Sequence, residues 1–245
     1  MKKVLIAAFL CAASSFAAWD KFPVLEDGKG EAKAGIYSYR QSAGPSVDDG
    51  SGIYAGVRYS PLQNLELLAI QEVYGDYTLG ARYQVIPVLA LGVDVGFPII
   101  STAWSFAPSL QFSMDLVPGL LSLGSNVGVS IYTEDYDKFA RGMDLDAGIE
   151  LDLTIGKSVI WGAFDVAAGI THSKNNAIKE GDKELSLKAE GAGRGLELKP
   201  SIGYMANVTD NLVLGTWVEI GHGDKETGYG HQPKTTVGTD FSVKF

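Results

Sequence analysis

The sequence predicts an all-β fold, a transmembrane antiparallel up-and-down β-barrel in which twelve strands is the favoured count. Apolar and polar residues alternate with a period of two along most of the chain. The alternating segments are mostly about nine to fourteen residues long, which is enough for a tilted strand to cross a bilayer. The connections between them alternate between short turns and longer polar loops. No apolar run approaches the ~18 residues that a transmembrane helix needs.

The alternation is clearest at 121–132, 143–154 and 235–245. Between 143 and 154, apolar residues occupy every odd position, and acidic, small or hydroxyl-bearing residues occupy every even one. Because successive side chains of a strand point to opposite faces, each of these segments has one apolar and one polar face.

Applied to the whole chain, the same pattern gives twelve strands. They are 31–41, 51–59, 64–74, 77–85, 88–97, 104–114, 120–132, 142–154, 158–171, 195–205, 211–222 and 235–245. The first and third segments alternate poorly, so the inward faces of these two stay open, and ten or fourteen strands remain alternatives.

The connections have a consistent asymmetry. Those after every second strand are short turns, whereas those on the other side are mostly longer and reach their greatest length at 172–194. Short turns at one end and long loops at the other are typical of a barrel with both termini in the periplasm. Within the longest loop, Gly181-Asp182 predicts a further small hairpin over 178–185.

The amino terminus resembles no barrel strand. Two lysines, a short apolar stretch and small residues before position 18 predict a secretory signal peptide over 1–17, cleaved after Ala17. Cleavage there removes Cys11, the only cysteine. Residues 18–30 are then a periplasmic N-terminal segment, either a disordered lead or a short lumen plug, and 31–245 form the barrel.

The apolar faces are expected to point outward. The polar faces carry charges, and a ring of twelve strands is too wide for a purely apolar packed interior. The chain then ends with Phe241, Val243 and Phe245 at alternate positions. This ending resembles the assembly signal of Gram-negative outer-membrane β-barrel proteins. The resemblance implies the cell outer membrane as location, outer-membrane lipid as surroundings, and the barrel-assembly machinery as a partner of the last strand.

A second resemblance rests on the stretch 56–67, followed by Gly80-Ala81-Arg82-Tyr83 and by 90–93. It is similar to the putative outer-membrane transporters grouped with MetA-pathway proteins of phenol degradation. This resemblance implies uptake of hydrophobic substrates.

Alternation also predicts which charged side chains line the lumen. The acids are Asp94, Asp144, Asp146, Glu150, Asp152, Asp165, Glu197, Glu219 and Asp240, and the bases are Arg58, Arg82, Lys199 and Lys244. This excess of acids predicts a channel or transporter for small solutes whose lumen prefers cations. In the alternative, the charges pair across strands and fill the barrel, with Arg58 directly opposite Glu66. The protein is then a non-conducting structural or surface-interaction barrel that acts through its extracellular loops.

Other functions find less support. The formal net charge of −9 and the pI near 4.8 argue against nucleic acid as a partner. His222-Gly223-Asp224 with Glu219 is the one group that resembles acid–base chemistry, and a membrane-embedded hydrolase is the third hypothesis. We expect no enzyme, no cofactor and no metal site.

Overall fold

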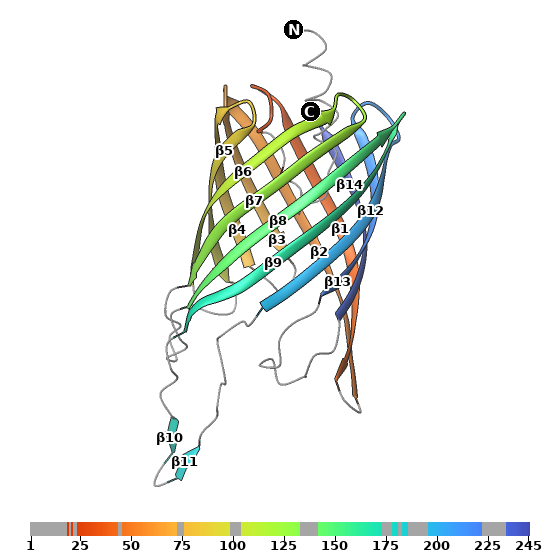
Figure 1. Ribbon diagram of the computed structural model, residues 1–245. Helices are drawn as coiled ribbons and strands as arrows, with labels where there is room; N and C mark the ends of the chain where they lie inside the picture. The colour runs from red at the N-terminus through yellow and green to blue at the C-terminus, as the bar shows by residue number, and fades with distance from the viewer. Residues whose placement is uncertain are drawn as a thin grey trace.

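The computed structural model describes residues 19, 21, 24–43, 46–72, 76–98, 104–132, 142–172, 178–180, 183–185, 196–221 and 234–245 (Figure 1). Within these, the side chains of 41–48, 72, 76, 98, 132, 142, 169–172, 178–180, 183–185 and 197 are outside the description.

Twelve long strands close into one antiparallel up-and-down barrel (Figure 1). Each strand pairs with its neighbours in the chain, and β1 pairs with β14 to close the ring. The strands are β1 (Gly30–Ala43), β2 (Ser46–Leu62), β3 (Leu65–Glu72), β4 (Asp76–Ile86), β5 (Leu89–Pro98), β6 (Ser105–Val117), β7 (Leu121–Tyr132), β8 (Gly142–Ile155), β9 (Ser158–His172), β12 (Leu196–Asn207), β13 (Leu212–Gly221) and β14 (Lys234–Lys244). The predicted fold class and the count of twelve are confirmed.

The remaining two strands, β10 (Ile178–Glu180) and β11 (Lys183–Leu185), form a separate two-stranded sheet within the longest loop. They pair antiparallel across the predicted Gly181-Asp182 position. The predicted hairpin is therefore confirmed, and it lies apart from the barrel wall at the long-loop end in Figure 1.

The largest difference from the predicted boundaries is in β2. This strand begins at Ser46 rather than 51 and pairs with β1 as far as Ala43, so the two make a hairpin that projects beyond the other strands (Figure 1). At its other end the register shifts between Tyr59 and Leu62. This bulge places Leu68 opposite Arg58, so the predicted direct pairing of Arg58 with Glu66 is wrong.

The short turns depend on residues that accept a left-handed backbone. Gly119 and Gly156 have φ angles of 71° and 63° in the turns after β6 and β8, and Asn64 has 66° after β2. Glycine and asparagine adopt this region at little cost. The start of the first strand and the end of the chain meet on this side, because the amide of Gly30 donates to the carbonyl of Phe245 over 2.8 Å.

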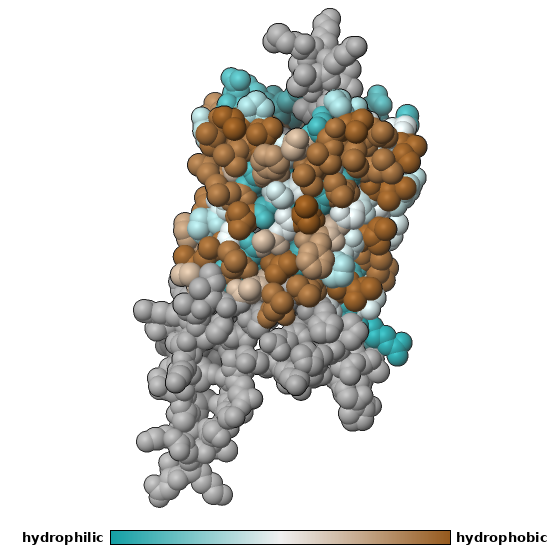
Figure 2. Space-filling view, viewed as in Figure 1, coloured by the Kyte–Doolittle hydropathy of each residue, from teal (hydrophilic) through white to brown (hydrophobic). Residues whose placement is uncertain are grey.

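The outside of the barrel is apolar, as Figure 2 shows over the visible face. Ile53, Leu91, Ile149 and Ile202 on four different strands are each about half exposed to the surroundings. The aromatic side chains of Tyr59, Tyr83, Trp104, Tyr204 and Phe245 are exposed as well, near strand ends. Such a surface suits lipid, with aromatic residues at its two edges. In the described part of the chain, no helix has the length and apolar character needed to span a membrane.

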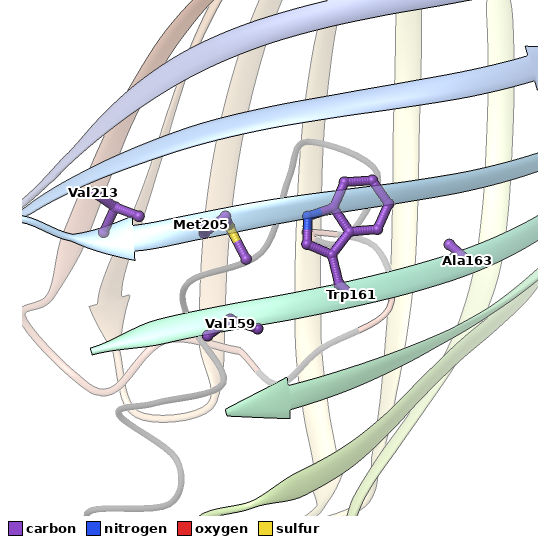
Figure 3. Close-up of a cluster of buried hydrophobic side chains, with 5 residues drawn as sticks. All are labelled: Val159, Trp161, Ala163, Met205 and Val213. Carbon is purple, nitrogen blue, oxygen red and sulfur yellow. The ribbon is translucent and has the colours of Figure 1, made fainter. Parts of the chain in front are cut away.

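Part of the interior is also apolar. Val159, Trp161 and Ala163 on β9 pack with Met205 on β12 and Val213 on β13 (Figure 3). Most of this cluster lies near the short turns, where β9 and β13 begin and β12 ends. These strands are apolar on both faces there, so alternation between apolar and polar residues does not identify their inward side chains.

The barrel interior as candidate functional site

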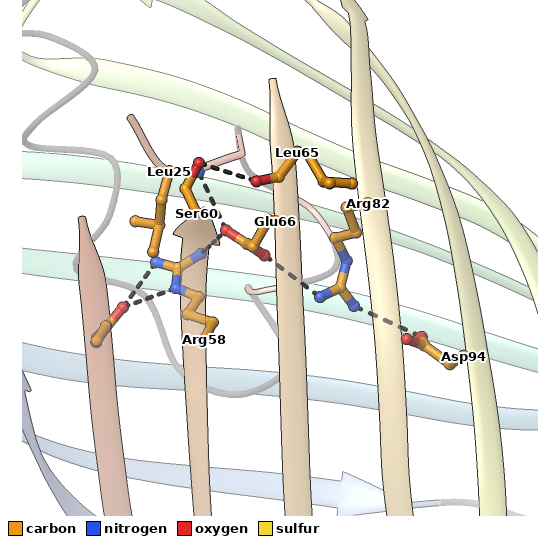
Figure 4. A network of polar contacts seen from close by, with 8 residues as sticks. Leu25, Arg58, Ser60, Leu65, Glu66, Arg82 and Asp94 are labelled. Carbon is orange, nitrogen blue, oxygen red and sulfur yellow. Dashed lines mark hydrogen bonds and ion pairs between the residues drawn. The ribbon is translucent and has the colours of Figure 1, made fainter. Parts of the chain in front are cut away.

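Five charged side chains of alternating sign cross five consecutive strands on the inner wall (Figure 4). Arg58 on β2 contacts Glu31 on β1 at 2.7 Å and Glu66 on β3 at 3.6 Å. Arg82 on β4 lies 3.5 Å from Glu66 and 3.5 Å from Asp94 on β5. We call these five residues the charge ladder.

The strand register explains why the charge ladder forms. Glu31 lies directly opposite Arg58, and Glu66 directly opposite Arg82, so each pair shares the inward face. Arg58 reaches Glu66 diagonally, across the bulge in β2. Side-chain exposure at Glu31, Arg58 and Glu66 is 1% each. Charges this deeply buried are tolerated because each carboxylate faces a guanidinium.

The segment before β1 enters the same interior. The Trp19 side chain is fully buried, with its ring 5.0 Å from Cζ of Arg58 and 5.4 Å from Nζ of Lys33. Both cations lie in the range of attraction to an indole face. Lys21, also buried, forms an ion pair of 2.7 Å with Asp165 on β9. The segment therefore spans the interior between β1–β2 and β9.

A backbone contact ties this segment to the charge ladder as well. The amide of Leu25 donates to Oε2 of Glu66 over 3.0 Å (Figure 4). Glu66 thus receives one backbone hydrogen bond and lies near two guanidinium groups. We call the part of 19–25 that the structure describes the N-terminal plug.

Strand β8 carries four of the acids singled out from the sequence. Asp144, Glu150 and Asp152 are buried, with 3%, 0% and 3% of their surface exposed. Asp146 is half-buried and accepts a hydrogen bond from the hydroxyl of Ser130. These side chains occupy alternate positions, so the inner face of β8 is the most acidic of the wall.

The other charges singled out from the sequence lie on β9, β12, β13 and β14. Asp165 lies opposite Lys199 as well as contacting Lys21, and Glu219 lies opposite Ser201 and Thr236. Asp240 is buried and accepts a hydrogen bond of 3.0 Å from the Tyr54 hydroxyl. Lys244 is half-buried on β14. The backbone of Glu197 lies opposite Ala167, but its side chain falls outside the described residues.

Besides the apolar cluster, sequence reasoning missed several interior residues, among them Trp19, Lys21, Glu31 and Lys33. The two strand residues belong to a segment that alternates only weakly, because alanine separates its charges. Glu31-Ala32-Lys33-Ala34 nevertheless carries the correct signal, with charges at alternate positions. The side chains of Phe241, Val243 and Phe245, which the sequence singled out as a candidate assembly signal, are exposed on the outer face of β14.

No family model matches the chain, and no curated protein matches it. Solved structures do resemble it. An outer membrane channel from Pseudomonas putida F1 has a TM-score of 0.60 and 11% identity over 91% of this chain and 97% of its own. The NanC porin has a TM-score of 0.55 and 8% identity over 86% and 100%. The KdgM porin, solved with a disordered oligogalacturonate, has 0.50 and 12% over 87% and 99%.

The chain has the fold of outer-membrane porins and channels. The porin-like fold accounts for the two-sided pattern of the strands, with an apolar outer face and a largely charged inner face. Within this porin-like barrel, the charge ladder, the N-terminal plug and the apolar cluster lie in the interior towards the short turns.

Aromatic rings also line the inner wall of the porin-like barrel, each laid over a glycine of the next strand. Trp161 covers Gly203, Trp217 covers Gly238, and Tyr37 covers Gly52, where a Cβ atom would collide with the ring. The three pairs lie in one continuous register across β9, β12, β13, β14, β1 and β2. Such rings protect strand glycines and stiffen the wall.

Metal chemistry has no candidate in the part of the chain that the structure describes, where no group of three His, Cys, Asp or Glu side chains is arranged to hold an ion. His222 and Asp224, on which the hydrolase hypothesis rests, lie outside the described residues.

Proposed function

We propose that this protein is an outer-membrane channel for small solutes, with an acidic lumen that prefers cations. The observation that carries the proposal is the surplus of carboxylates on the inner wall. Outside the charge ladder and the Lys21–Asp165 pair, the described inward acids are Asp115, Asp144, Asp146, Glu150, Asp152, Glu219 and Asp240, and the described inward bases are Lys33, Lys199, Lys234 and Lys244. Negative walls of low dielectric concentrate cations and repel anions.

Membrane placement follows from the outer surface. The apolar belt with aromatic residues near the strand ends supports a lipid environment, and the porin-like fold supports the outer membrane. Delivery there requires the signal peptide over 1–17, with cleavage after Ala17. We further propose that the barrel-assembly machinery recognises the outward row of Phe241, Val243 and Phe245 on β14.

A non-conducting barrel is the second candidate, and the N-terminal plug favours it. Trp19 and Lys21 are almost inaccessible to solvent, with 0% and 1% exposed. A barrel that stays filled at this level would act through its long loops. Hydrophobic uptake, which the resemblance to MetA-pathway transporters implies, and hydrolysis at His222 have no described interior feature in their favour.

Single-channel recording separates these candidates. We expect the mature barrel, refolded into planar bilayers under a KCl gradient, to show steady openings with a cation-selective reversal potential. The variant Asp144→Asn/Asp146→Asn removes two inward charges and should shift the reversal potential towards zero. Asp210→Asn, on an exposed short turn, is the control and should leave it unchanged.

Two outcomes would contradict the proposal. A correctly folded barrel without openings would support the non-conducting alternative. Openings with anion preference, or a reversal potential that Asp144→Asn/Asp146→Asn leaves unchanged, would show that the acidic wall does not determine selectivity.

A further inference from the structure

The outer wall of the barrel carries two neighbouring charges at the long-loop end. Arg40 on β1 and Asp49 on β2 are both exposed and lie directly opposite each other. Among the strand side chains that the structure describes on the outer face, these two are the only charged ones. A charge that faces lipid is costly at the bilayer midplane and is tolerated near the interface. The pair therefore marks the edge of the apolar belt on the long-loop side.

Three adjacent strands change from apolar to polar at this edge. Towards the long loops, the outward residues are Ile36, Ser38 and Arg40 on β1, Ile53, Ser51 and Asp49 on β2, and Val237 and Thr235 on β14. The register places these rows side by side, so that Ser38 lies between Ser51 and Val237. Exposed aliphatic side chains thus continue directly into a patch of hydroxyl groups and charges.

This patch borders a hollow of about 840 Å³, a size in the range of small-molecule sites. The residues that line it include Ser38, Arg40, Asp49, Ser51, Thr235 and Val237. Within the described part of the chain Arg40 forms no ion pair, although Asp49 lies directly opposite. Its guanidinium is therefore available to a ligand, beside one carboxylate and three hydroxyl groups.

Lipid is the molecule that meets this side of the barrel. An acyl chain that packs against Ile36 or Val237 places its headgroup where the strands become polar, because outward residues follow each other every ~6.5–7 Å along a strand. Arginine binds a phosphate group through two parallel hydrogen bonds. A headgroup made of phosphate alone would be repelled by Asp49, whereas sugar hydroxyls can donate hydrogen bonds to this carboxylate.

We propose that this hollow binds the phosphorylated saccharide headgroup of a glycolipid in the outer leaflet, with its acyl chains along the apolar belt. Arg40 holds the phosphate group, and Asp49 accepts a hydrogen bond from a sugar hydroxyl. The hydroxyl groups of Ser38, Ser51 and Thr235 bond the rest of the saccharide. The inference rests on the proposed membrane placement and is independent of conduction.

Native mass spectrometry of the mature barrel, refolded in detergent micelles, tests this site. The probe is lipid A, an acylated glucosamine disaccharide with two phosphate groups, and the comparison lipid is phosphatidylglycerol, which has one phosphate group and no sugar. The variants are Arg40→Gln, which removes the charge, Arg40→Lys, which keeps it without the planar fork, and Asp49→Asn. The matched control is Lys157→Gln, which removes one exposed positive charge at the short-turn end.

The wild-type barrel should bind lipid A more tightly than phosphatidylglycerol. Arg40→Gln should weaken lipid A binding about tenfold, as expected for one lost charge-assisted hydrogen bond, and Arg40→Lys should have an intermediate affinity. Asp49→Asn should weaken binding of lipid A and strengthen binding of phosphatidylglycerol, because the carboxylate bonds a sugar but repels a bare phosphate. Lys157→Gln should change neither affinity.

Three outcomes would overturn the site. Equal affinity for the two lipids, or lipid A binding that Arg40→Gln leaves unchanged, would mean that lipid adheres to the belt without recognition of its headgroup. A dimer that Arg40→Gln abolishes and lipid A does not displace would make a second copy of the chain the occupant.

Conductance of the same samples keeps the two proposals apart. A barrel that binds lipid A through Arg40 and never opens would retain the lipid site and reject the channel. Cation-selective openings without a preference for lipid A would retain the channel and reject the lipid site.

Discussion

At the scale of single residues, the interior depends on a few charges that have no access to water. Arg58 is the clearest example, because it lies between Glu31 and Glu66 and beneath the ring of Trp19. Two buried carboxylates and one indole are oriented by this one guanidinium.

Replacing Arg58 with methionine should therefore destabilise the barrel strongly. The change keeps the volume of the side chain but leaves Glu31 and Glu66 buried without their shared cation. We expect the free energy of unfolding to fall by about 3–5 kcal/mol, the usual cost of breaking a buried ion pair from one side. Urea unfolding in lipid vesicles measures it.

The double variant Arg58→Met/Glu31→Gln is the control, since it also removes one of the stranded charges. It should recover part of the lost stability. A single variant as stable as the wild type would mean that water reaches Glu31 and Glu66, contrary to their burial.

The inward direction of a side chain was predictable only where a polar residue stands between apolar neighbours in the chain. Asp144 and Asp146 stand between Met143, Leu145 and Ala147, so their inward direction follows from alternation. Gln111 lies between Leu110 and Phe112 and carries the same signal, but nothing in the chain indicates that its amide is buried without a hydrogen-bond partner among the described residues.

At the scale of an element, the two faces of β8 meet different surroundings, lipid on the outside and the polar interior on the inside. Ile149 is 46% exposed on the outside, near the middle of the strand, whereas Asp146 is half-buried inside. The same substitution on the two faces tests which of them meets lipid.

Ile149→Arg should lower the free energy of unfolding by about 2–4 kcal/mol in lipid vesicles, the cost of an arginine at the bilayer midplane. Asp146→Arg places the same side chain in the polar interior and should cost much less, while it shifts the reversal potential towards anions. Equal stability of the two variants would contradict the assignment of the outer face to lipid.

The bounds of the strands were predictable to within a few residues wherever turn-forming residues and the end of the alternating pattern coincide. β7, β8 and β9 match their expected bounds almost fully, whereas β2 extends beyond them because its first residues alternate too weakly to be recognised. On β9, β12 and β13 the inward Val159, Met205 and Val213 resemble outward residues, since both faces are apolar. Where both faces of a strand are apolar, the sequence pattern alone does not tell which face points into the barrel; that depends on the direction in which the sheet curves.

At the scale of the whole molecule, the N-terminal plug occupies part of the interior, between β1, β2 and β9. The sequence left two alternatives for residues 18–30, a disordered lead and a lumen plug. The choice between these two depends on whether Trp19 contacts cations inside the barrel. The cations are Lys33 on β1 and Arg58 on β2, and the register of these two strands places both on the inner face. No local pattern in the chain contains that information.

Weakening the N-terminal plug should open the barrel. Trp19→Ala/Lys21→Met removes the indole between Lys33 and Arg58 and the ion pair to Asp165, so we expect conductance to rise several-fold in planar bilayers. Lys157→Met, on an exposed short turn, is the control. Unchanged conductance in the double variant would mean that the segment does not limit passage.

The seam between β1 and β14 has a consequence for the timing of assembly. Its register runs from Glu31 opposite Lys244 to Gln41 opposite Lys234, and completing these pairs seals the ring. Trp19 and Lys21 lie inside that ring, although their segment directly precedes the first strand of the seam. A ring sealed without them would have to admit a charged segment afterwards. We therefore expect the seam to close around the leading segment, so that pairing of β1 with β14 and enclosure of Trp19 and Lys21 occur together.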